Sequence, residues 1–177
     1  MNQSFAALLL AARRERQLVI ATALTDGAPS GQARQARLAQ QQGAGAAALR
    51  ADLLADPAQV RAALTAVRAA SSLPLLLTYR STTEGGKGAG HGQGYEDYLA
   101  SLLQLRPAVA AVDIEMACPA SKALVAEAKA GGYDVVGSCH DFTATPSAAQ
   151  ITQKLAKITA AGADITRVAY MPRTAQD

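Results

Sequence analysis

The chain has 177 residues, of which 50% are hydrophobic, and it carries a formal net charge of +3. This length and apolar content suit one folded unit with its own buried core and exclude a disordered chain. Lysine and arginine are scattered, and only 4% of the residues are aromatic, so the basic stripes and stacking platforms of nucleic-acid binding are missing. We therefore expect no nucleic-acid partner.

The sequence also predicts no membrane span, because no stretch reaches the roughly 18 consecutive apolar residues that a spanning helix needs. The opening segment, residues 1–17, places an apolar run before three arginines. A secretory signal has the opposite order, so we expect a first helix, with mitochondrial targeting or a membrane-surface helix as open alternatives. Cys118 and Cys139 lack C-x-x-C spacing, which favours free thiols in a reducing cytoplasm.

From residue 17 onward, short apolar runs alternate with Ala-rich segments of helical period. This alternation is typical of repeated β-α units around a parallel sheet. Strands are predicted at 17–24, 45–53, 74–80, 108–116, 133–142 and 165–172. Helices are predicted at 30–42, 57–71, 94–105, 119–131 and 147–161. Proline after Asp56, a capping box from Ser147 to Gln150, and glycines after the helices support these limits.

Polar residues gather at the carboxyl ends of the predicted strands. They are Arg50, Asp52, Arg80, Glu84, Asp113, Glu115, His140 and Asp141. In parallel α/β folds these strand ends converge on one crevice, where ligands bind. The arginines suit anionic groups, and an imidazole can move a proton near neutral pH. One site with both properties is predicted.

Four segments of the sequence point to a family. They are LLLTYRSTTEGG (75–86), VDIE (112–115), CHDFTATPS (139–147) and GADITRVAYMP (162–172). In order and spacing they closely resemble type I 3-dehydroquinate dehydratase, a shikimate-pathway lyase, and the resemblance covers roughly residues 17–172. It implies an α/β fold with parallel β-α repeats of TIM-barrel type, incomplete at about six of eight strands. We expect residues 1–177 to form a single barrel-like domain that lacks the last two β-α units.

The resemblance also implies roles for individual residues. In the family a lysine on the sixth strand forms a Schiff base with the ketone of dehydroquinate, and a histidine moves a proton from the carbon beside the imine to the departing hydroxyl. His140 matches that histidine and Glu84 the carboxylate that orients it. Arg50 and Arg80 match the substrate-binding arginines. The lysine is replaced by Arg167, whose guanidinium has no free amine lone pair for imine formation.

Other readings of these residues stay open at the level of sequence. His140 could be a buried strand-end histidine bonded to a carbonyl, and Glu84 a solvated turn residue. Arg50 and Arg80 could form structural ion pairs with Asp52 and Glu115. Arg167 could neutralise carboxylates or bind substrate.

Two further departures from the family follow the second strand, where Ala48 and Leu49 replace a glutamate and a tryptophan. The loop 85–94 matches no phosphate-binding motif, and we expect it to be mobile, with Lys87 and His91 exposed. The two histidines lack a second ligand at metal spacing, so neither a metal nor a cofactor is expected. Lys122 is the one lysine that could replace the lost amine.

Two functions are compatible with this pattern. The chain is either a dehydratase weakened or inactivated by Arg167, or a non-catalytic protein that binds a carboxylated polyhydroxy ring. The expected partner is a small molecule such as 3-dehydroquinate. The first and sixth strands would be open edges, so a homo-oligomer, and most simply a dimer, is also expected.

Overall fold

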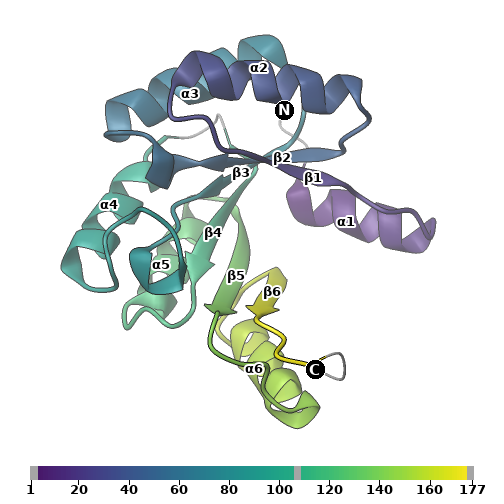
Figure 1. The fold of residues 1–177 in the computed structure, drawn as a ribbon, viewed down its shortest axis with the longest axis vertical. Coiled ribbons are helices and arrows are strands. Elements are labelled where there is room, and N and C mark those ends of the chain that lie inside the picture. The colour runs from purple at the N-terminus through teal and green to yellow at the C-terminus, as the bar shows by residue number, and fades with distance from the viewer. Residues whose placement is uncertain (1–3, 106–108, 175–177) are drawn as a thin grey trace.

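The computed structural model describes residues 4–105 and 109–174, and within them six strands form one curved sheet (Figure 1). All neighbouring strands are parallel, and their order in the sheet is their order in the chain. The strands are β1 (Ala21–Leu24), β2 (Ala46–Arg50), β3 (Leu75–Thr78), β4 (Ala111–Glu115), β5 (Asp134–Asp141) and β6 (Ile165–Tyr170). The predicted β-α repeats of TIM-barrel type, six strands long, are confirmed.

Helices connect the strands and cover the sheet from outside. They are α2 (Pro29–Gln41), α3 (Pro57–Ala70), α4 (Gln93–Leu103), α5 (Ser121–Ala130) and α6 (Ala148–Ala160). The first helix, α1 (Phe5–Arg14), lies instead within the concave side of the sheet (Figure 1). None of the helices in the described segments is long and apolar enough to cross a membrane.

The predicted strand limits were too wide, because the first strand starts at Ala21 rather than at residue 17 and short turns follow two other strands. β2 ends at Arg50, and a 3-10 turn, η1 (Ala51–Leu53), takes over; a second turn, η2 (Thr82–Glu84), follows β3. Residue 108 of the fourth predicted strand and residues 1–3 of the first predicted helix lie outside the described residues.

The predicted helix signals are present at both ends. Asp56 accepts a hydrogen bond from the Gln59 amide, and Ser147 and Gln150 form the capping box. Gly43, Gly132 and Gly162, which follow helices, all have positive φ angles, a conformation that costs glycine little.

Alternating residues of the strands divide the core into two layers. Outward-facing residues such as Leu49, Leu77 and Ile114 pack under the covering helices. Inward-facing Leu76 and Val136 belong to a separate cluster with Phe5 of α1 and the partly buried Leu8 and Leu9. Because side chains alternate along a strand, the residues two positions beyond this inner cluster also face inward, and these are the polar residues of the site.

Candidate functional site

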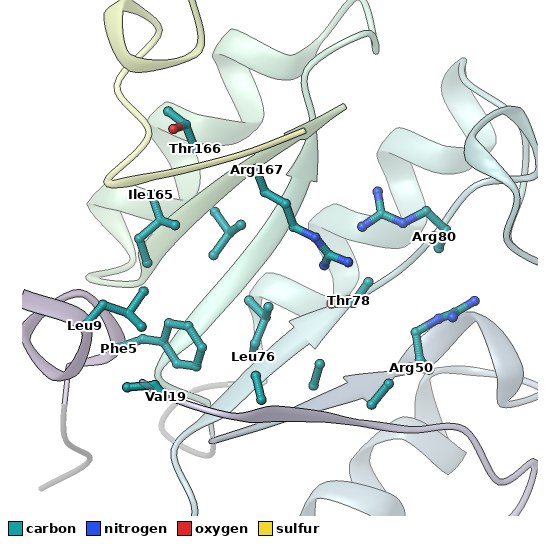
Figure 2. Close-up of a pocket in the computed structure, with 14 residues that line it drawn as sticks. Phe5, Leu9, Val19, Arg50, Leu76, Thr78, Arg80, Ile165, Thr166 and Arg167 are labelled. Atoms are coloured by element: carbon teal, nitrogen blue, oxygen red, sulfur yellow. The ribbon is translucent and has the colours of Figure 1, made fainter. Parts of the chain in front are cut away.

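The concave face of the sheet encloses a cavity of about 400 Å³ (Figure 2). Arg50 at the end of β2, Arg80 just after β3 and Arg167 within β6 line it at one end. Phe5 and Leu9 of α1 line the other end. The structure thus brings together all three predicted binding arginines, two of them at the carboxyl ends of strands, as expected for this topology.

Arg80 is the centre of a buried polar network. Its Nη1 atom lies 2.9 Å from Glu115 Oε1 and 3.3 Å from Glu84 Oε2, and its Nη2 atom lies 2.6 Å from Asp113 Oδ2. It also donates to Ser138 Oγ. Burial by itself would lower the pKa of Arg80, but the three carboxylates outweigh it and raise that pKa above its usual value. The guanidinium is therefore permanently charged and fixed in place.

His140 and Glu84 form the predicted imidazole–carboxylate pair. His140 Nδ1 lies 2.7 Å from Glu84 Oε2, and the His140 backbone N–H donates to the same oxygen at 3.1 Å. Because a carboxylate can only accept, Nδ1 carries a proton, and in the neutral form of the ring Nε2 is then the atom with the free lone pair. Glu84 is buried rather than a solvated turn residue, and the partner of His140 is a carboxylate rather than a carbonyl. Neither residue lines the cavity, and both connect to it through Arg80.

Arg50 forms the ion pair that was the structural alternative for it. Its Nε and Nη2 atoms bind the two oxygens of Asp52 at 2.7 and 2.6 Å. Burial would raise the pKa of Asp52, but hydrogen bonds from Arg50 and from the Lys87 amide outweigh it and hold that pKa below 3.8. Arg50 is thus both ion-paired and part of the cavity wall.

Arg167 is the least restrained of the three arginines. Among the described residues it forms one ion pair, with 3.8 Å between Nη1 and Asp113 Oδ2, and half of its side chain is exposed. It lies opposite Ser138 in the β5–β6 register. Figure 2 shows its guanidinium extended toward Arg80, so the cation in the middle of β6 faces the arginine-lined end of the cavity.

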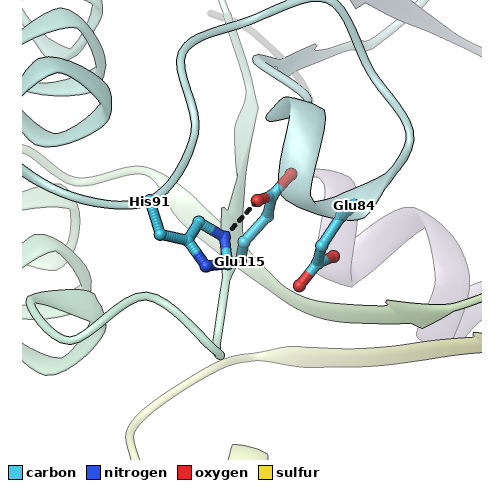
Figure 3. A group of neighbouring side chains, drawn as sticks. All are labelled: Glu84, His91 and Glu115. Atoms are coloured by element: carbon cyan, nitrogen blue, oxygen red, sulfur yellow. Dashed lines mark hydrogen bonds and ion pairs between the residues drawn. The ribbon is translucent and has the colours of Figure 1, made fainter.

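In the loop at 85–94, Lys87 is exposed as expected, but the expectation that His91 is exposed was wrong. Residues 85–92 are tied to the site by hydrogen bonds, and His91 Nε2 lies 2.6 Å from Glu115 Oε2 (Figure 3). Only 13% of the His91 side chain is exposed. Its neighbours in sequence are glycines, which carry no hydrophobic pattern, so no sequence signal placed His91 against Glu115.

Glu84, His91 and Glu115 place three possible metal-ligand atoms within 4.8 Å of one another. The spacing argument against a metal site therefore missed this cluster. Hydrogen bonding nevertheless disfavours an ion here, because the Glu115 oxygens already accept from Arg80, Ser81 and His91. The Arg80 guanidinium contacts Glu84 and Glu115, two of the three possible ligands. We therefore interpret the cluster as an ion-pair network.

Lys122 does not lie at this site. It lines a second cavity of about 210 Å³, shared with Cys139 and with Lys154 and Lys157 of α6. This cavity is on the outer side of the sheet, because the helices that line it, α5 and α6, cover that side. The hypothesis that Lys122 replaces the lost amine is not supported by this position.

Comparison with known proteins gives a consistent answer. A family model described as type I 3-dehydroquinase matches residues 20–177. The 3-dehydroquinate dehydratase of Methanosarcina acetivorans is 36% identical over 143 residues, covering 78% of this chain and 59% of that protein. The one from Klebsiella pneumoniae is 37% identical over 130 residues, covering 69% of this chain and 49% of its own length. The chain thus spans less than two thirds of these relatives.

Solved structures agree with the sequence comparison. The 3-dehydroquinate dehydratase of Enterococcus faecalis superposes with a TM-score of 0.81 at 27% identity, covering 89% of this chain and 68% of that one. The type I enzyme of Clostridium difficile has the same TM-score at 23% identity and covers 88% and 64%. At 23% identity, the second match supports the fold alone.

Proposed function

Since the chain belongs to the type I 3-dehydroquinase family, we propose that it binds 3-dehydroquinate and dehydrates it slowly to 3-dehydroshikimate, without a covalent intermediate. One observation carries this proposal. The His140–Glu84 pair, with Nδ1 and Oε2 2.7 Å apart, adjoins through Arg80 a cavity lined by three arginines. The combination supplies both a proton carrier and an anion site.

The three arginines differ in how many of their donors remain available to a ligand. Arg80 and Arg50 already donate to carboxylates of the protein at distances of 2.6 to 2.9 Å. Arg167 makes one contact, at 3.8 Å, and keeps its planar donor pairs available for a substrate carboxylate. We assign Arg167 as the main anchor of the ligand and the other two arginines as the positively charged wall around it.

His140 is the proposed proton carrier. With the Nδ1 proton held by Glu84, Nε2 is free to take a proton from the carbon beside the ketone and to return it to the departing hydroxyl. The family's lysine would accept the developing charge as an imine, and Arg167 cannot. Electrostatic stabilisation by cations remains, so we expect a rate several powers of ten below that of a covalent route.

Restoring the amine tests this division directly. We expect the Arg167→Lys, Ala48→Glu double variant to form an imine with 3-dehydroquinate, because both side chains line the cavity at positions 167 and 48. Borohydride reduction followed by mass spectrometry should detect the adduct in the double variant and not in the parent chain.

The matched control adds Lys122→Ala to the double variant. The adduct should persist, because Lys122 lines the other cavity. A double variant that is folded yet gives no adduct would contradict the proposed ligand position.

A non-catalytic binding function is the second candidate, and Arg167 is the observation that favours it. In that case 3-dehydroquinate would raise the melting temperature of the parent chain, while the absorbance of the conjugated enone product would never appear. Product formation that depends on His140 would instead favour the dehydratase.

The same proposal includes assembly and location. We propose that the chain, as a single barrel-like domain, forms a dimer in the cytoplasm. Leu18 and Ile20, beside β1, are 95% and 63% exposed, which supports an apolar contact at this edge of the sheet. Cys118 and Cys139 are buried free thiols, in keeping with a reducing compartment.

A further inference from the structure

The loop of residues 85–92 wraps closely around the backbone of Arg80. The Gly86 amide donates to the Ser81 carbonyl at 2.7 Å, and the Gly88 amide donates to the Arg80 carbonyl at 2.9 Å. A Cβ atom on Gly86 would lie only 2.1 Å from the Arg80 carbonyl oxygen. Glycine is thus needed here for close packing against Arg80, and the loop holds a defined position.

The same loop contacts the carboxylate partners of two site arginines. The Lys87 amide donates to Asp52 Oδ2, which also binds Arg50. Further along, His91 Nε2 meets Glu115, which binds Arg80 through its other oxygen. The loop therefore contacts the partner of Arg50 at one point and a partner of Arg80 at another.

The His91 ring is fixed in one orientation. Glu115 is fully buried and accepts hydrogen bonds from the Ser81 amide and hydroxyl and from Arg80. A carboxylate with these donors has no proton to give, so His91 Nε2–H is the donor. The ring packs edge-on against Tyr95 at 5.5 Å, and the His91 amide donates to Thr83 Oγ1.

We propose that His91 is a positioning residue of the site, acting on His140 through Glu115, Arg80 and Glu84. Arg80 Nη1 is shared between Glu115 and Glu84, and its contact with Glu84 is the longer, at 3.3 Å against 2.9 Å. Without His91, Glu115 lacks one of its donors and draws Arg80 closer. Glu84 then loses the cation that holds it, and the His140 ring loses its fixed orientation.

The test compares His91→Gln with His91→Leu in the full chain. The Gln amide can place a donor near the position of Nε2, whereas Leu cannot donate. The readout is the His140 Nδ1 proton in NMR spectra without ligand, which the bond to Glu84 protects from exchange with water. We expect its exchange rate to rise about tenfold in His91→Leu, equivalent to one weakened buried hydrogen bond, and to stay within about twofold of the parent in His91→Gln.

Lys87→Ala, an exposed position on the same loop, is the matched control and should leave the proton unchanged. Glu115→Gln should reproduce the effect of His91→Leu. If His91→Leu does not fold, His91→Asn, whose shorter amide falls short of Glu115, takes its place. The proposal would be overturned if the His140 Nδ1 proton exchanged as slowly in the folded Leu or Asn variant as in the parent. Equal exchange rates in the Gln and Leu variants would overturn it as well.

This inference rests on the proposed function only in taking His140 as the proton carrier. The NMR comparison uses no substrate, so it can fail while 3-dehydroquinate is still converted or bound. Conversely, a chain that neither binds nor converts 3-dehydroquinate can still show the His91 effect on His140.

Discussion

Arg80 forms ion pairs with three buried carboxylates through one guanidinium, those of Glu84, Asp113 and Glu115. Its side chain is only 7% exposed, whereas that of Arg167 is 51% exposed. The two arginines line the same cavity, yet they differ in what their loss would leave behind. Loss of Arg80 leaves carboxylates buried without a cation, and loss of Arg167 leaves a partly solvated surface.

This contrast predicts different stability effects. Arg80→Leu should lower the free energy of unfolding by about 3–5 kcal/mol, because it breaks a buried ion pair from one side. Arg167→Leu should change it by less than about 1 kcal/mol, as for an exposed pair. Urea denaturation at pH 7 measures both. Equal losses for the two variants would mean that Arg80 is not the centre of the network.

At the scale of elements, two short turns place two of the acidic residues of the site, Asp52 and Glu84. η1 follows β2 and carries Asp52 back onto Arg50, and η2 follows β3 and carries Glu84 back onto Arg80. The Ser81 side chain caps η2 by accepting from the Glu84 amide. These turns end the strands earlier than the apolar pattern suggested, and they bring each carboxylate to the arginine at the end of its own strand.

The Asp52 pair predicts a defined pH dependence of stability. Its pKa is lowered in the folded state from the usual 3.8, so the stabilisation is complete above that value and is lost as pH falls through the lower folded-state pKa. Asp52→Asn should therefore be less stable than the parent at pH 7, and the difference should shrink in acid below pH 3.8.

Urea denaturation across that range measures the effect. In an Arg50→Gln background, which lacks the partner cation, the pH dependence attributable to Asp52 should be smaller. An unchanged dependence would assign the low pKa to the Lys87 amide instead.

For the molecule as a whole, the curvature of the sheet determines which elements lie around the site. Its concave face holds the cavity, with α1 at one end and the arginines at the other. Within the described residues, β1 and β6 each pair with one neighbouring strand. Apolar side chains beside β1 are exposed at this edge, and natural proteins usually cover such edges.

The proposed dimer can be tested at this edge. Leu18→Lys with Ile20→Lys should shift the chain to a monomer in sedimentation at concentrations where the parent is a dimer, because two desolvated lysines oppose the contact. Leu10→Lys, at an exposed position on α1, serves as the control and should leave the dimer intact. A dimer that survives the double change would place the interface elsewhere.

The type and order of the elements could be predicted because they depend on local pattern. Apolar runs and helical repeats follow one another in the sequence, and alternation along each strand puts Arg50, Asp113, His140 and Arg167 on one face. The pairing of His140 with Glu84 was predicted from motif resemblance. The exact strand ends were missed, because the turns η1 and η2 depend on side-chain contacts rather than on hydrophobicity.

The sequence by itself determined the β-α repeat and the family, and it placed an arginine at position 167, where the resemblance implies a lysine, since each is carried by residue identity and spacing. Only the tertiary structure decided that His91 binds Glu115, 24 residues away, and that Lys122 faces a different cavity. The physical reason is that glycines allow many backbone conformations, so the conformation of the loop 85–92 is set by the residues that it packs against. Likewise, a helix start can lie beside a site in sequence while its side chains face the opposite side of the sheet.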